Sequence, residues 1–157
     1  MDDRPINEDA SDIALYLAVR KNLSMVESKF LLDVQVSVFQ GEVLLTGALP
    51  SIDLIDKAVE ATWKTQDVRR VYNYIRLGKT QNVVDTSGEA AVSTAIRGQL
   101  MLTEGVKASN YKIVVERGVV YVMGLQNTPE EWEAARAVIK NTVGVQKVIC
   151  LMHEKNS

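Results

Sequence analysis

The sequence predicts an α+β protein that consists of two tandem α-β-β-α-β modules. In each module a small three-stranded mixed sheet is expected to pack on two helices. The prediction starts from residues 107–126, which are expected to form two short strands joined by a tight turn, because residues 31–49 repeat the same pattern earlier in the chain. The matching glycines, each pair 77 residues apart, are Gly41 and Gly47 in the first hairpin and Gly118 and Gly124 in the second.

The repeat extends over almost the whole chain. A shift of 77 residues aligns residues 11–77 with the second half without a gap, and about a fifth of the aligned positions are identical. We therefore expect a flexible lead-in at residues 1–10, a first domain at 11–77, a linker at 78–88 and a second domain at 89–155. The identical pairs include Ala18/Ala95, Arg20/Arg97, Leu23/Leu100, Val38/Val115, Val43/Val120, Ala58/Ala135, Val68/Val145 and Val71/Val148.

The first module is predicted to open with a helix over residues 11–23, with Ser11 and Asp12 as candidate caps. Leu15, Val19 and Leu23 recur at helical spacing and are expected to form its buried stripe.

Two strands then follow, because valines alternate with polar residues from Val34 to Val38, and Gly41 can adopt the positive φ of a tight turn. A second helix is predicted over roughly residues 52–66, opened by Pro50 and Ser51, and a third strand over residues 68–77.

The second module repeats this order. A helix is predicted over residues 89–102, then the hairpin, a helix over 129–142 and a strand over 145–152. Thr128 is the expected cap of the later helix, and Pro129 suits its first turn because proline lacks an N–H that would otherwise need a partner there.

The composition is that of a folded protein, with 46% apolar residues, 24% charged residues and a net charge of −2. Such a small net charge gives no overall attraction to nucleic acid or to anionic lipid, so either contact would need a local patch. No apolar run reaches the roughly 18 residues of a transmembrane helix. No signal peptide is visible, and the polar stretch after Met1 is compatible both with a removed leader and with a cytosolic start.

The sequence offers little support for catalysis. His153 is the only histidine, which leaves zinc spacings and serine-hydrolase triads without a basis. Cys150 is the only cysteine and is predicted to be a small core residue within a strand. Glu130 and Glu131 start a helix, where carboxylates suit the helix dipole. We therefore predict no enzyme, no catalytic residue, no metal and no cofactor. Nucleic-acid binding is not expected either, because an aromatic and basic platform is missing.

Comparison of the two copies separates core from surface. Positions that are apolar in both first helices, such as Val19 and Ile96, are expected in the core. The opposite face of the second copy is small and carries one cation and one thioether, which suits shallow contact with lipid headgroups, although a plain solvated face is an open alternative. The candidate lipid-binding residues on this face are Ala90, Thr94, Arg97 and Met101.

A second set of outward apolar residues suggests an interface between domains or with a partner. Ile13 and Leu17 lie opposite the core stripe of the first helix, and Trp63 aligns with Lys140, a predicted surface position. Val114, Tyr121 and Met123 lie on the back of the second hairpin, where the first copy has Ser37, Leu44 and Thr46. A sheet face this apolar is expected to be covered, by the other domain, a ligand or a second chain. Trp132, by contrast, is predicted to be core.

Basic residues also gather around the third predicted strand of the first module. They are Arg69, Arg70, Arg76 and Lys79. Near an anionic surface each could contribute roughly 1 kcal/mol through phosphate headgroups, and ordinary solvation is the alternative.

The order helix, hairpin, G-x-V-x-L-x-G, helix and V-x-x-V-x-N resembles the BON domain. In the first half the residues that carry the resemblance are Gly41, Val43, Leu45, Gly47, Val68, Val71 and Asn73. In the second half they are Gly118, Val120, Val122, Gly124, Val145 and Val148, with Cys150 where the family often has asparagine. Two copies with little else are similar to the DolP-like outer-membrane lipoproteins and to an osmotically induced periplasmic BON protein.

This resemblance implies a non-enzymatic, periplasm-facing protein that associates with phospholipid and supports the outer membrane. The implied partners are an anionic phospholipid or membrane surface and envelope proteins, and the oligomeric state stays open. In DolP-like proteins an aromatic near the start of the second domain's first helix helps that helix contact lipid. Here Ala91 stands at about that place, and residues 89–102 contain no aromatic, so contact through an aromatic is not expected. The rival hypothesis is a protein-interaction scaffold that uses the apolar outer faces.

Overall fold

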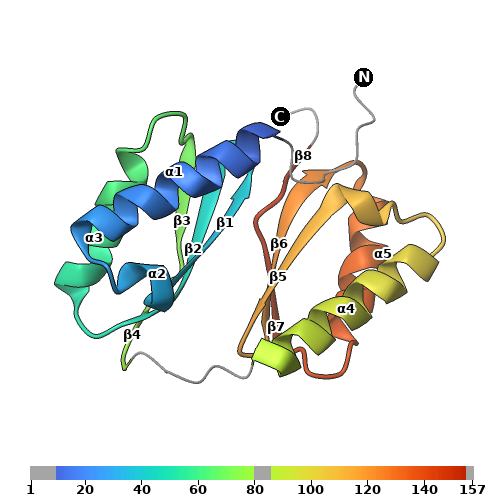
Figure 1. The fold of residues 1–157 in the computed structure, drawn as a ribbon. Coiled ribbons are helices and arrows are strands. Elements are labelled where there is room, and N and C mark those ends of the chain that lie inside the picture. Colours follow the sequence, from blue (N-terminus) through green and yellow to red (C-terminus); the bar gives the residue numbers. More distant parts are fainter. Residues whose placement is uncertain (1–9, 80–85, 155–157) are drawn as a thin grey trace. The chain divides into compact units, whose positions relative to one another are not determined.

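The computed structural model describes residues 10–79 and 86–154, and the chain divides into two compact units at the boundary between Val84 and Asp85 (Figure 1). Most of the predicted lead-in, and residues 80–85 of the predicted linker, lie outside the described residues. Each unit is described below by itself, as the first module and the second module.

The first module contains three helices and four strands among its described residues. They are α1 (Ala10–Val26), α2 (Phe30–Asp33), β1 (Val34–Phe39), β2 (Glu42–Leu49), α3 (Ile52–Trp63), β3 (Arg70–Asn73) and β4 (Arg76–Leu77). The second module repeats this order. Its elements are α4 (Thr86–Leu102), the 3-10 helix η1 (Ala108–Asn110), β5 (Tyr111–Glu116), β6 (Val119–Gln126), α5 (Pro129–Lys140), β7 (Lys147–Cys150) and β8 (His153–Glu154).

Both sheets are mixed, as predicted. In the first module β2 pairs antiparallel with β1 and parallel with β3, and in the second module β6 pairs in the same way with β5 and β7. The two long helices of each module cover one face of its sheet (Figure 1). The α+β class and the repeated α-β-β-α-β order are therefore confirmed.

The predicted core stripes are also confirmed. Val19 and Leu23 of α1 are fully buried, as are Ile96 and Leu100 at the matching positions of α4. They pack against the valines of their own sheet, with Val43 in one cluster and Val120 in the other. The helical spacing of apolar residues thus places α1 and α4 correctly.

Some local predictions need correction. The predicted third strand over residues 68–77 is two strands, β3 and β4, because regular strand geometry is interrupted at Tyr74 and Ile75. There the Asn73 Oδ1 accepts a hydrogen bond from the Ile75 N–H at 3.1 Å. The start of the first predicted hairpin is the short helix α2. The Asp12 carboxylate Oδ2 accepts a bond at 3.0 Å from the Gln40 N–H, so it holds the β1–β2 turn against α1.

The other caps follow the prediction. The Ser51 hydroxyl oxygen accepts from the Leu54 N–H at 3.2 Å, and the Thr128 hydroxyl oxygen accepts from the Glu131 N–H at 3.1 Å, with Pro129 in the first turn of α5. Each cap satisfies one of the backbone donors that a helix leaves free at its start.

The strand-ending glycines have a structural reason that is the same in both modules. Gly47 and Gly124 have φ values of +115° and +135°. A Cβ atom at either position would lie closer than 3.0 Å to a backbone carbonyl oxygen, that of Asp33 in the first module and that of Asn110 in the second. Both glycines therefore let β2 and β6 pass directly over the backbone that precedes the neighbouring strand.

The turn glycines differ from these. Gly41 and Gly118 have φ values of +83° and +80°, and a Cβ there would first meet a side chain, that of Arg69 or that of Gln146. Their carbonyl oxygens accept hydrogen bonds from the N–H groups of the same two residues, at 2.8 Å and 2.7 Å. All four glycines thus serve the hairpin itself.

Candidate functional site

The outward face of α4 carries the four candidate lipid-binding residues. Ala90, Thr94, Arg97 and Met101 are all exposed, and their spacing of three or four residues places them along one side of the helix. Ile96 and Leu100 fix the opposite side in the core. The structure therefore brings the four candidates together on one surface.

This face is notable for its low charge. Between residues 90 and 102 Arg97 is the only charged residue, and the other exposed positions are occupied mainly by alanine, threonine and glycine. At the carboxyl end Met101 and Leu102 are 74% and 87% exposed. The outer face of α5 differs, since Glu130, Glu133, Arg136 and Lys140 are exposed there. A solvated helix face is usually charged like that of α5, so the composition of the α4 face calls for an explanation.

The loop after α5 packs on the side of α4 that carries Val92 and Gln99, away from the four candidate residues. A Cβ on Gly144 would come within 2.9 Å of Val92, so this loop lies directly against α4. The Thr142 hydroxyl donates to the Val138 carbonyl at 2.8 Å, and its oxygen lies 3.3 Å from the side-chain amide of Gln99. These contacts hold the loop in place. Val143, between Thr142 and Gly144, is 92% exposed.

The candidate interface residues fall into two groups. Ile13 and Leu17 are exposed one turn apart on α1, and Trp63, about half exposed, is the last residue of α3. On the back of the second sheet Tyr121 and Met123 are buried and Val114 is half-buried.

Leu44 and Thr46, at the matching positions of the first sheet, are buried as well. None of Leu44, Tyr121 and Met123 belongs to the core clusters between sheet and helices. That the apolar back of the second sheet is covered by the other domain, a ligand or a second chain stays a prediction.

The prediction for Cys150 is wrong, because this thiol is exposed. β7 is an edge strand of only four residues, and Cys150 is its last residue. Asn73, at the same place in the first module, is exposed too. Trp132 is partly buried and packs against the second core cluster, with its ring centroid 6.2 Å from that of Tyr111.

A polar cluster beside Trp132 escaped the sequence analysis. The Glu131 Oε2 accepts from the Tyr111 hydroxyl at 2.8 Å and from the Lys107 N–H at 3.2 Å, and so ties the start of α5 to β5. Burial, followed by the hydrogen bond and negative charge of Glu131, raises the pKa of the Tyr111 phenol above its ordinary value. The phenol is therefore a firmly protonated structural donor.

Sequence reasoning also missed a group of exposed aliphatic side chains at one end of the first module. They are Met25, Val26, Leu31, Leu32 and Leu77. Leu31 and Leu32 were assigned to a strand, in which one of two neighbours would point inward, whereas both are exposed on the short helix α2. The paired leucines outside any helical stripe are the signal that could have found them.

The described residues lack two kinds of feature. They contain no group of three His, Cys, Asp or Glu side chains that could hold a metal ion. Among these same residues, no helix has both the length and the apolar character needed to cross a bilayer.

Residues 18–79 and 88–156 each match the family model described as the BON domain. The chain belongs to the BON-domain family. The two matches fall on the two modules, so the protein is a tandem BON protein, and the hairpin glycines described above are features of both of its BON domains.

Three proteins illustrate how far this BON protein resembles others. The "Uncharacterized protein in gshII 5'region" of Anaplasma centrale is 30% identical over 147 residues, covering 93% of this chain and 96% of that protein. The 21 kDa hemolysin of Actinobacillus pleuropneumoniae is 31% identical over 150 residues, covering 95% of this chain and 77% of that protein. The outer membrane lipoprotein DolP of Haemophilus influenzae is 28% identical over 111 residues, covering 71% of this chain and 57% of DolP.

Solved structures give only a distant likeness. CdsD, a structural protein of the type III secretion system of Chlamydia trachomatis, is 10% identical with a TM-score of 0.38, covering 85% of this chain and 90% of the CdsD chain. A likeness at this level carries no information about function.

Proposed function

We propose that this protein is a non-enzymatic component of the bacterial cell envelope that binds the surface of anionic phospholipid membranes. The outward face of α4, formed by Ala90, Thr94, Arg97 and Met101, is the proposed contact. Membership of the BON family and the similarity to the outer membrane lipoprotein DolP support an envelope role. On the same grounds we propose a periplasmic location at the outer membrane and a contribution to the integrity of that membrane.

The observation that carries this proposal is the chemistry of the α4 face. Small side chains allow a helix to approach a headgroup layer closely, and the exposed Met101 and Leu102 offer flexible apolar groups at its edge. Arg97 supplies one cation at the centre of the face, where it can meet a lipid phosphate. A surface of this kind is suited to shallow, reversible binding, because it buries little apolar area and neutralises one charge.

Co-sedimentation with phosphatidylglycerol vesicles tests the proposal. The Arg97→Glu variant replaces an attraction of about 1 kcal/mol by a repulsion of similar size, so its partition coefficient is expected to fall by about tenfold or more. Arg136→Glu is the matched control, because Arg136 is exposed on α5 of the same module and undergoes the same change of charge. Equal binding by the two variants, or no binding by the wild type, would sink the proposed lipid face.

A second candidate function is supported by the exposed apolar residues of the first module. Ile13 and Leu17 on α1 and Trp63 on α3 could hold a protein partner or a second copy of the chain. We also propose that Val114, Tyr121 and Met123 take part in an interface between domains or with a partner. Light scattering after size-exclusion chromatography tests self-association: a monomer at every concentration would rule it out, and Leu17→Asp should dissociate a dimer that uses α1.

A further inference from the structure

One end of the first module is unusually rich in exposed aliphatic side chains. The short helix α2 leads directly into β1, whose first residue Val34 pairs with Gly47 of β2. On the other side of β2, β4 pairs with Ala48 and Leu49. Because neighbouring strands are about 4.8 Å apart, α2 and β4 flank the end of β2 at roughly 10 Å from each other. We call this region the α2–β4 end.

The leucines of the α2–β4 end are held outward by the fold. Phe30 of α2 is fully buried in the core and fixes the orientation of the helix. Leu32 is 80% exposed, Leu77 is 58% exposed and Leu31 is 36% exposed. Met25 and Val26, at the adjoining end of α1, are exposed as well. Large apolar side chains that gather in this way on a folded surface usually mark a contact with a partner or a membrane.

The second module shows that the fold does not need these leucines. A shift of 77 residues places Ala108 and Ser109 at the positions of Leu31 and Leu32, and Glu154 at that of Leu77. The strand pairing is the same, since β8 pairs with β6 as β4 pairs with β2, and the 3-10 helix η1 stands at the place of α2. Leu31, Leu32 and Leu77 therefore serve something other than the packing of a BON module.

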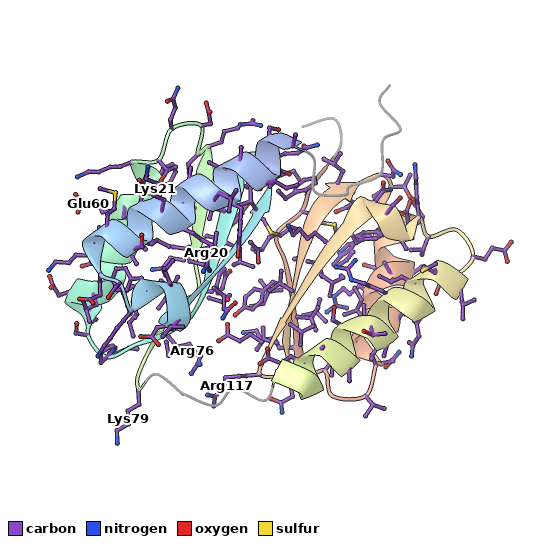
Figure 2. All side chains as sticks on the ribbon, in the orientation of Figure 1. Arg20, Lys21, Glu60, Arg76, Lys79 and Arg117 are labelled. Atoms are coloured by element: carbon purple, nitrogen blue, oxygen red, sulfur yellow. The ribbon has the colours of Figure 1, made fainter. Side chains whose placement is uncertain are left out.

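The charges around the α2–β4 end indicate what it meets. Lys29, Arg76 and Lys79 are exposed there, and Figure 2 shows Arg76 and Lys79 at this end of the module, whereas Arg20 and Lys21 project from α1. Three acidic residues lie in the same region. Glu27 and Asp33 are half-buried, and Asp53 forms an ion pair with Lys57 at 3.2 Å.

Aliphatic side chains surrounded by lysine and arginine are typical of surfaces that sit at a membrane interface, because the leucines enter the acyl boundary while the cations stay among the phosphates. Protein interfaces, by contrast, are usually centred on aromatic residues. The exposed large apolar residues that define this end, Met25, Val26, Leu31, Leu32 and Leu77, include no aromatic. The balance of side chains therefore favours an anionic bilayer as the occupant.

We propose that the α2–β4 end of the first module is a second membrane contact, which inserts Leu31, Leu32 and Leu77 into the interface of an anionic bilayer. Lys29, Arg76 and Lys79 lie among the headgroups around them. This inference rests on the proposed function for its ligand class, but it assigns the deeper contact to the module that lacks the α4 face.

Site-specific labelling tests the inference and separates it from the proposed function. The single native thiol is removed by Cys150→Ser, and Leu32→Cys, Ser109→Cys or Met101→Cys then carries an environment-sensitive fluorophore. Vesicles of phosphatidylglycerol mixed with phosphatidylcholine are compared with phosphatidylcholine alone. The label at position 32 is expected to shift to the blue on the anionic vesicles. The label at position 109, the matching half-buried position of the second module, is expected to keep its emission unchanged.

Each outcome decides between the two contacts. A response at position 101 without one at position 32 overturns the α2–β4 contact and leaves the α4 contact standing. A response at 32 without one at 101 supports the α2–β4 contact and removes the α4 face. An equal response at 32 and 109 contradicts the proposal, because the contact would not then depend on the leucines.

An affinity measurement with unlabelled protein gives a second readout. Leu32→Asp and Leu77→Asp each place a carboxylate where a leucine is expected to insert, and each should lower the partition coefficient on anionic vesicles by about tenfold. Ser109→Asp is the matched control and should change binding by less than about twofold. Both leucines are exposed, so the variants are expected to unfold at the wild-type temperature, which circular dichroism checks. Wild-type binding by the folded leucine variants would overturn the proposal.

Discussion

Replacing Gly124 by alanine is expected to destabilise the second module by at least about 3 kcal/mol. Gly124 has a φ of +135°, a region that is essentially closed to residues with a Cβ and costs them about 1–3 kcal/mol. The new methyl group would also lie closer than 3.0 Å to the Asn110 carbonyl oxygen. Relief of that clash requires β6 to move away from β5, and the register pairs Gly124 with Tyr111 there.

Two other glycines of the same module supply graded controls. At position 118 the backbone φ is +80°, which an alanine rarely adopts, but the new Cβ would first meet the side chain of Gln146, which can move. Gly118→Ala is therefore expected to lower the free energy of unfolding by about 1–2 kcal/mol. Gly98→Ala lies inside α4, where a Cβ meets nothing within 4 Å. Because alanine is the better helix former, this change is expected to stabilise the module by about 0.5–1 kcal/mol.

Urea unfolding followed by tryptophan fluorescence measures the series. A Trp63→Phe background leaves Trp132 as the only tryptophan, and its packing against the second core makes it a reporter of the second module. The free energies of unfolding should fall in the order Gly98→Ala, wild type, Gly118→Ala, Gly124→Ala. A Gly124→Ala protein no less stable than the Gly118→Ala protein would refute the argument from the close backbone approach.

Three further predictions concern polar groups in the modules. The raised pKa of Tyr111 means that the folded state keeps the phenol protonated, whereas the phenol of the unfolded chain ionises near pH 10. The contribution of Tyr111 to the free energy of unfolding is therefore complete below about pH 10. Above that pH the free energy of unfolding falls by up to about 1.4 kcal/mol per pH unit. Unfolding followed by Trp132 from about pH 9 to about pH 11 should show this fall, and Tyr111→Phe should remove it. Thr65→Val should cost about 1–2 kcal/mol in urea unfolding, since the Thr65 hydroxyl is buried, donates to the Ala61 carbonyl at 3.0 Å and accepts from the Asn22 amide at 2.9 Å. Thr128→Ala should cost about 1 kcal/mol by the same assay through loss of the α5 cap, and a cost near zero would mean that water replaces the cap without penalty.

The sequence was a good guide wherever one physical rule decides the structure. Apolar spacing located α1 and α4, and turn chemistry located both hairpins, because Gly41 and Gly118 adopt positive φ values that favour glycine. The repeat strengthened these predictions, since Val19 and Ile96 are both apolar and both buried. The same comparison placed Arg97 and Met101 on an exposed face.

The sequence was a poor guide where local and tertiary contacts compete. The sequence predicts Asp12 as a candidate cap of its own helix. Its hydrogen bond from the Gln40 N–H spans 28 residues, and no local sequence pattern predicts such a contact. Cys150 follows strand alternation, yet the end of an edge strand is not covered. The sequence predicts a hairpin that starts at Leu31, because helix and strand cannot be told apart in a short apolar run. The exposed leucines of the α2–β4 end depend on α2 being a helix oriented by the buried Phe30, which the sequence pattern does not predict.

The two proposed contacts predict a specific result when both are removed. Each contact alone is weak, because α4 offers one cation and a few small groups, while the α2–β4 end offers a few aliphatic side chains and three cations. Joined in one chain, the second contact forms at a high effective concentration once the first is bound, so affinity exceeds that of either. Arg97→Glu and Leu32→Asp lie in different modules and share no hydrogen-bond partner among the bonds described, so their effects on the free energy of binding should add. The double variant should then show the product of the two single losses on anionic vesicles. If each contact binds the membrane only separately, the two partition coefficients add, so each single variant keeps the binding of the other contact. The double variant would then lose more than the product of the two single losses, which would contradict simultaneous binding through both modules.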